Sequence, residues 1–369
     1  MYKDNSVNTD SLKTGASRYR DLDALRGFAS VMVVVFHFTY GREQARYGFF
    51  LGSTGVDLFF IISGFVIFMS INKVASAKEF MINRFSRLFP AYWTCVTLTA
   101  AVQFTALRFH FVHPDSVNIS WLKYLANLTM FQKYFGYSNV DGSYWSLLIE
   151  MLFYIGIVLL FKFNKIKNIF GVGVITLTVI LINDFLANNF AGWPFEQITF
   201  WLPIVHHAAL FFAGILFYKF VNQTESQTKL YLAIICCYLV QLKIYYTIRG
   251  LSSTINFSQY ACALAVIFLV FILFANNKLS FITNTTTLFF GKISYSLYLL
   301  HQFLGAGIII PGLERFLHFN FLTAAVIAFI VITALAYIVT TYIETPVGKK
   351  IKNKLYQGYV KQSDLSVTS

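Results

Sequence analysis

The sequence predicts an all-α polytopic membrane protein with about ten transmembrane helices and both termini in the cytoplasm. Of the 369 residues, 57% are hydrophobic and only 12% are charged. Long apolar runs recur from residue 22 to residue 342, and each is near the ~20 residues that cross a bilayer as a helix. This pattern excludes a water-soluble fold.

Ten segments have the length and apolar character of a membrane span. In chain order they are residues 22–40, 49–71, 88–107, 144–161, 169–187, 198–218, 230–247, 257–275, 288–310 and 321–343. The stretch 121–135 is also apolar, but Lys123 and Lys133 interrupt it. We therefore expect a re-entrant or interfacial helix there.

The distribution of lysine and arginine sets the orientation. These residues gather before the first span, between the second and third spans, and after the last span, and they are scarcer in the alternate connections. Since lysine and arginine are retained on the cytoplasmic side, both termini are expected there. This divides the chain into a polar cytoplasmic tail (1–20), a transmembrane domain (21–346) and a basic cytoplasmic tail (347–369) that we expect to be partly disordered. The formal charge of +13 follows mostly from this topology, and we infer no nucleic-acid partner from it.

The first span carries Arg26 near its start and His37 deep inside it. In a helix, His37 lies about 16 Å further along than Arg26 and only about 20° round from it, so one face is polar. A titratable side chain near the bilayer midplane costs about 2.5 kcal/mol or more unless it faces protein or water. His37 is therefore either a functional residue or a hydrogen-bond partner of a neighbouring helix.

Further polar groups recur at a common depth. Asp57 in the second span lies about 12 Å in from the outer face, and Glu150 in the fourth span about 10 Å, with Tyr154 one turn below it. In the ninth span Ser294, Tyr298 and His301 form one helical stripe. Convergence from four spans indicates a buried reaction chamber or a conduction path.

The third span opens with Arg84 and Arg87, which face the same way at its cytoplasmic mouth. Guanidinium pairs suit bidentate recognition of phosphate, although on spacing alone ordinary positive-inside anchoring is the favoured explanation. At the end of the last span, Pro346 predicts that the helix stops near Thr345.

These segments together resemble the acyltransferase family 3 proteins. The motifs are LDALRG (22–27) with His37, GVDLFF (55–60) with SGF (63–65), RFSRLFP (84–90), SYWSL (143–147) with Glu150, and GKISYSLYLLH (291–301). The resemblance extends from about Asp21 to Pro346 and implies a multi-pass enzyme of the bacterial inner membrane, in contact with membrane lipid. Such enzymes move an acyl group, usually acetyl, from cytoplasmic acyl-CoA to a hydroxyl of a surface glycan. The stand-alone form, without an appended esterase-like domain, is expected.

The resemblance implies that His37 is the essential histidine and that Arg84 and Arg87 bind the acyl donor. Neutral imidazole can act as general base or accept the acyl group itself, and both routes remain open. Asp57 or Glu150 would fix the imidazole tautomer. The remaining expected site residues are the donor-binding Arg26 and Lys292 and the acceptor-contacting or supporting Ser63, Trp145, Tyr154, Tyr298 and His301.

We expect acyl-CoA as a cosubstrate, no permanently bound cofactor and no metal. His206 and His207 in the sixth span are expected to be hydrogen-bonded to a neighbouring helix, to bind a metal or to contact the acceptor, and the first of these is favoured because metal ligands in register are scarce. The alternative function is a proton-coupled transporter or flippase, which would also need intramembrane carboxylates and histidines. Paired repeats and broken helices in corresponding positions, which such transporters usually show, are not evident in the sequence.

Overall fold

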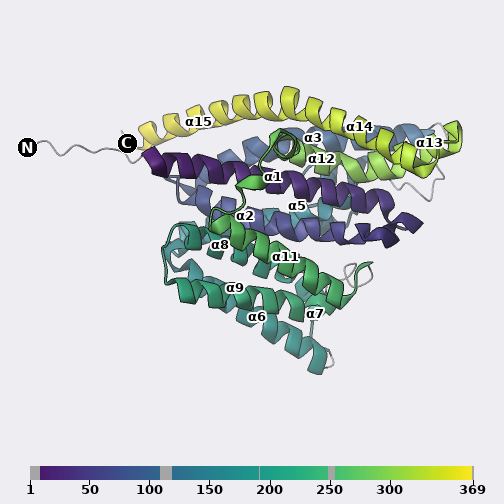
Figure 1. The fold of residues 1–369 in the computed structure, drawn as a ribbon. Coiled ribbons are helices and arrows are strands. Elements are labelled where there is room, and N and C mark those ends of the chain that lie inside the picture. Colours follow the sequence, from purple (N-terminus) through teal and green to yellow (C-terminus); the bar gives the residue numbers. More distant parts are fainter. Residues whose placement is uncertain (1–8, 109–118, 191, 248–253, 368–369) are drawn as a thin grey trace, which may run out of the picture.

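The computed structural model describes residues 9–108, 119–190, 192–247 and 254–367, and these contain helices and connecting turns without any strand. The longer helices lie roughly side by side in a bundle (Figure 1). Their bounds are α1 Thr9–Thr39, α2 Gly55–Ile71, α3 Ala77–Arg108, α5 Trp145–Lys162, α6 Ile169–Asn189, α8 Ala208–Val221, α9 Gln227–Lys243, α11 Phe257–Ala275, α12 Thr285–Leu300, α14 Phe321–Val339 and α15 Thr345–Val367.

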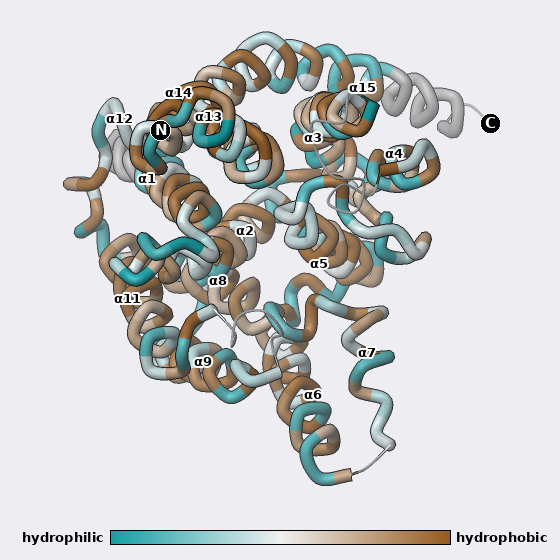
Figure 2. The backbone as a smooth tube through the Cα atoms, turned by 90° about the vertical axis from the view of Figure 1, so that its right-hand side faces the viewer, coloured by the Kyte–Doolittle hydropathy of each residue, from teal (hydrophilic) through white to brown (hydrophobic). Residues whose placement is uncertain are grey.

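Seven helical segments of the described residues are long and apolar enough to cross a membrane, and they include α1, α2, α5, α6, α11, α12 and α14. The other three predicted spans fall on α3, on α9 and on a broken segment described below. Apolar side chains also cover outward-facing helices, for example Ile175, Val179 and Ile182 of α6, which are 64%, 56% and 52% exposed. Figure 2 shows brown, apolar stretches along α6, and the exposed apolar side chains there suit contact with lipid.

The start of α1 and the end of α15 lie at the same end of the bundle (Figure 1), which we call the terminal end. Helix α1 packs most closely on α12, and α2 on α8. At the second of these contacts a Cβ on Gly64 would lie 2.0 Å from the Phe211 carbonyl oxygen, so only glycine permits this backbone approach. These two helix pairs form the frame of the bundle.

Two sequence expectations about helices, the span over 198–218 and the stop at Thr345, change in the structure. The span predicted over 198–218 is broken into α7 (Phe195–Trp201), η7 (Pro203–His206) and α8, because Pro203 has no N–H with which to continue α7. The segment 121–135 forms the short helix α4 (Trp121–Asn127) and η4 (Gln132–Phe135), neither of them long enough to span a bilayer.

The predicted stop at Thr345 is wrong. Helix α14 continues through a π-helix, η11 (Thr340–Glu344), into α15, and the result is one long arched rod (Figure 1). Pro346 is the second residue of α15, where the preceding π turn has already disrupted the i→i−4 ladder, so its missing N–H costs little. The tail expected to be partly disordered is therefore helical as far as Val367.

Candidate active site

Three cavities follow one another along the bundle. A mouth cavity of about 540 Å³ lies at the terminal end between the start of α3 and the start of α15. A narrow central cavity of about 100 Å³ lies among α1, α2, α3, α5 and α12. An outer cavity of about 610 Å³ lies toward the opposite end, where α1 ends and α5 begins.

Shared side chains show that these cavities are neighbours. Arg84 and Arg87 line both the mouth and the central cavity. Val56 and Tyr298 line both the central and the outer cavity. The central cavity therefore lies next to both the mouth and the outer cavity.

The mouth is rich in cationic groups. Arg84 donates to the Ser70 hydroxyl at 2.8 Å, while its Nε is buried without a hydrogen-bond partner. From the opposite wall α15 contributes Lys349 and Lys352. A buried guanidinium N–H without a partner suits an anionic ligand, since the donor is otherwise left unsatisfied.

Glu150 organises the central cavity. Its Oε1 accepts hydrogen bonds from the Ser63 and Tyr154 hydroxyls, each at 2.5 Å. Arg26 also lines this cavity and forms an ion pair with Asp23 at 2.9 Å. The cavity is therefore lined by a carboxylate, three guanidinium groups and several serine and tyrosine hydroxyls among apolar side chains.

His37 lies at the wall of the outer cavity. Its Nδ1 lies 3.0 Å from the Val33 carbonyl oxygen and 3.1 Å from Nε2 of His301. The structure therefore pairs His37 with another histidine, whereas the expected partners were Asp57 or Glu150. Asp57 instead lies within hydrogen-bonding reach of Tyr260, and one of its carboxylate oxygens is buried without a partner.

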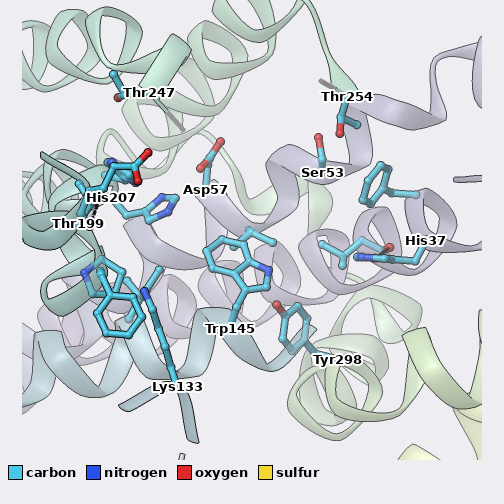
Figure 3. A pocket seen from close by; sticks show the side chains of 18 of the residues that line it. His37, Ser53, Asp57, Lys133, Trp145, Thr199, His207, Thr247, Thr254 and Tyr298 are labelled. Atoms are coloured by element: carbon cyan, nitrogen blue, oxygen red, sulfur yellow. Dashed lines mark hydrogen bonds between the residues drawn. The ribbon is translucent and has the colours of Figure 1, made fainter. Parts of the chain in front are cut away.

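The outer cavity combines aromatic and polar side chains. Figure 3 shows Trp145 between His37 and Tyr298 on one side and His207 on the other. Trp145 is 41% exposed, although it lies at the start of α5 inside the bundle. Lys133 points in from η4 with its Nζ 4.7 Å from the Phe200 ring centroid, and burial lowers the pKa of its ammonium.

Most of the predicted site residues line these three adjacent cavities, with two exceptions. His301 is fully buried and contacts His37 from behind the cavity wall. Lys292 has its Nζ 5.7 Å from the Tyr337 ring centroid, on a face of α12 that lines none of the three cavities. Sequence reasoning missed Lys133, Lys349 and Lys352. Two of these lie beyond the expected helix stop, so only recognising that α14 continues into α15 would have revealed them.

The break at Pro203 places His206 and His207 against the outer cavity. His206 Nε2 and His207 Nδ1 are buried without a hydrogen-bond partner. Among the described residues, no group of three or more histidine, cysteine or acidic side chains has a metal-binding arrangement. Both histidines line the outer cavity, but these two nitrogens do not make the hydrogen bonds that the sequence favours for them.

Comparison with known proteins gives a consistent picture. The model of a family described as an acyltransferase domain matches residues 19–341. The O-acetyltransferase OatA of Staphylococcus aureus (strain NCTC 8325 / PS 47) is 27% identical over 89% of this chain, which spans 57% of that protein. The peptidoglycan O-acetyltransferase OatA of Listeria monocytogenes is 24% identical over 55% of this chain and 40% of its own length. The putative peptidoglycan O-acetyltransferase YrhL of Bacillus subtilis is 33% identical over 39% of this chain and 24% of its own length. No solved structure matches significantly.

Proposed function

We propose that this chain, which belongs to the acyltransferase family matched over residues 19–341, transfers an acetyl group from acetyl-CoA to a hydroxyl of a cell-envelope glycan. The observation that carries this proposal is the series of three cavities, which joins a basic mouth to His37 through shared residues. The relatives named above are O-acetyltransferases and are consistent with it. The proposed location is the bacterial inner membrane.

The donor would enter at the terminal end. Coenzyme A carries several phosphates on a long, thin pantetheine arm. Its phosphates would bind Arg84, Arg87, Lys349 and Lys352, and the unpartnered Nε of Arg84 is the donor that most needs an anion. The arm would pass through the narrow central cavity, where Arg26 could polarise the thioester oxygen as negative charge develops.

The chemistry would take place at His37. In the direct route His37 Nε2 removes the proton of the acceptor hydroxyl while its oxygen attacks the thioester carbonyl. The C–S bond breaks, and the departing coenzyme A thiolate receives the proton from the imidazolium. In the alternative route His37 Nε2 attacks the thioester carbonyl, the C–S bond breaks and the coenzyme A thiolate leaves. The acceptor hydroxyl oxygen then attacks the acetyl group, the N–C bond breaks, and the hydroxyl proton passes to the thiolate. In both routes the products are the O-acetylated glycan and coenzyme A.

The acceptor would bind in the outer cavity. Its volume of about 610 Å³ admits more than one sugar ring, and its exposed Trp145 offers an apolar face for the C–H groups of a sugar. Hydroxyl-bearing and ionisable side chains around it, among them Thr199, Thr247 and His207, offer hydrogen bonds to sugar hydroxyls. The outer cavity also has room for the hydroxyl to reach His37.

The test uses purified protein in detergent, where no proton gradient exists. We would incubate it with radiolabelled acetyl-CoA and a panel of peptidoglycan fragments and N-acetylglucosamine oligosaccharides, and follow coenzyme A release and label on the sugar. Wild-type protein should label at least one acceptor, and His37→Ala should lower the rate ~100-fold or more, the contribution of general-base catalysis. Absence of transfer, with gradient-dependent sugar uptake in vesicles, would overturn the proposal in favour of a transporter.

A further inference from the structure

Two histidines from helices far apart in the sequence are in direct contact. The rings of His37 on α1 and His301 lie with their centroids 4.8 Å apart at an interplanar angle of 69°. His301 is 0% exposed, whereas His37 lines the outer cavity. The two rings therefore have different roles available to them, since only His37 can reach a ligand in that cavity.

Backbone carbonyls decide where the ring protons lie. The Nδ1 of His301 is 2.6 Å from the Tyr298 carbonyl oxygen, and a carbonyl can only accept, so this nitrogen must carry its proton. The Nε2 of neutral His301 is then an acceptor. The Nδ1 of His37 faces both this acceptor at 3.1 Å and the Val33 carbonyl oxygen at 3.0 Å, so it must donate. The remaining ring nitrogen, Nε2 of His37, makes no hydrogen bond to the described residues and keeps its lone pair.

We infer that His301 is a positioning residue that holds His37 in the tautomer with Nδ1 protonated, so that Nε2 is the basic or nucleophilic atom. This role rests on the proposed function, since it concerns the same reaction. His301 takes the place of the carboxylate that orients the catalytic histidine in many hydrolase sites. Neutral His301 fixes the orientation and the tautomer of the His37 ring without adding a negative charge to a buried site.

The fold supports His301 with unusual backbone geometry. His301 is the first residue of a π-helix, η10 (His301–Ile309), and π segments that interrupt α-helices are frequent at functional sites. The widened turn is fixed by Asp141, whose Oδ2 accepts from the Phe303 N–H at 2.8 Å. Gly305 lies under the Phe38 ring, and a Cβ there would be 2.6 Å from that ring. The π-helix can therefore approach α1 closely enough for the histidines to meet.

The contact also has a use during the reaction. When His37 Nε2 takes the hydroxyl proton, the ring becomes an imidazolium, and its Nδ1–H then donates a charge-assisted hydrogen bond to His301. In the route with an acyl-imidazole, the same bond stabilises the positive ring. His301 ends each cycle with the protons with which it began.

The experiment compares His301→Leu with His301→Gln. Leucine cannot accept from His37, whereas a glutamine amide oxygen can accept and its NH₂ can still donate to the Tyr298 carbonyl. In the acetyl-CoA assay, kcat should fall ~10–100-fold in His301→Leu with the KM for acetyl-CoA unchanged, and His301→Gln should recover part of the loss. His318→Gln, an exposed histidine outside the three cavities, is the control for the substitution itself.

A spectroscopic measurement separates positioning from mere support of the fold. In protein labelled with ¹⁵N-histidine, the signal lost in His37→Ala identifies His37, and in the wild type it should report protonated Nδ1 and unprotonated Nε2. His301→Leu should move part of this signal to the other tautomer. Wild-type kcat in a correctly folded His301→Leu variant, or an unchanged His37 tautomer in it, would overturn the inference while leaving the proposed function intact. A tautomer shift in a protein without any acetyl transfer would overturn the proposed function instead.

Discussion

Gly27 on α1 lies backbone to backbone against Gly291 on α12, and each glycine comes ten residues before a histidine of the His37–His301 pair. A Cβ on Gly27 would lie 2.8 Å from the Gly291 amide nitrogen, and one on Gly291 would lie 2.0 Å from the Asp23 carbonyl oxygen. Both helices run away from the terminal end and rise about 1.5 Å per residue. A contact fixed at the glycines therefore sets the two histidines level with one another.

We expect Gly27→Ala and Gly291→Ala to force α1 and α12 apart. Overpacking of this kind costs about 1–3 kcal/mol, and the displacement should separate the histidines enough to lower kcat more than it lowers stability. Thermal unfolding in detergent and the acetyl-CoA assay measure the two effects. Gly156→Ala on α5 is the matched control, because a Cβ there meets no atom within 4 Å, and it should leave both quantities near wild type. Wild-type activity in both variants would show that the glycine contact does not set the histidine pair.

The proposed donor site should make two nearby lysines on α15 differ in their effect on the KM for acetyl-CoA. Lys352→Ala should raise the KM for acetyl-CoA about two- to fivefold, as expected for a partly exposed charge, because this side chain lines the mouth cavity. Lys350→Ala removes an equal charge from the same helix at a position that does not line this cavity, and the KM should stay near the wild-type value.

Substitution of Arg84 or Arg87 should raise the KM for acetyl-CoA more than substitution of Lys352 does. Arg84→Lys and Arg87→Lys keep the positive charge but lose the planar, bidentate guanidinium group. The loss of one charge-assisted hydrogen bond, about 1.5–3 kcal/mol, should raise the KM for acetyl-CoA about tenfold or more. Binding of coenzyme A by calorimetry checks this without the chemical step. Equal affinity in both lysine variants would assign these arginines to membrane anchoring.

Glu150 should act through its two hydroxyl partners. Glu150→Gln retains an oxygen that accepts hydrogen bonds from Ser63 and Tyr154, so the fold should be kept. Any loss of activity in this variant should then come from the lost negative charge alone. Glu150→Ala leaves two hydroxyl groups without their acceptor, a cost of about 1–3 kcal/mol each when buried, and should lower the unfolding temperature as well. If Glu150 instead fixed the His37 tautomer, the glutamine variant would shift the ¹⁵N signal of His37, and we expect no such shift.

The sequence predicts which polar side chains line the cavities better than it predicts their partners. His37 and Glu150 are identifiable because a polar group inside an apolar span is energetically costly. Arg84 and Arg87 are identifiable as two arginines one helical turn apart just before the third span. The partner of His37 is not identifiable, because neighbouring helices are set by contacts such as Gly27 with Gly291, which hydropathy does not encode. The π turns at His301 and Thr340 were also missed, since they arise from tertiary packing and not from local propensity.

Trp145 provides the most direct test of the acceptor site. Its indole is 41% exposed at the wall of the outer cavity, beyond the narrow passage through which the donor arm would reach His37. Trp145→Ala should therefore raise the KM for the glycan about tenfold, as expected for loss of an aromatic face against sugar C–H groups, and leave the KM for acetyl-CoA unchanged. Trp145→Phe should recover part of the affinity because it keeps an aromatic face.

Trp121→Ala serves as the control, since Trp121 is 70% exposed on α4 and lines none of the three cavities. A rise in the KM for acetyl-CoA with an unchanged KM for the glycan would place the donor in the outer cavity and reverse the proposed direction of entry.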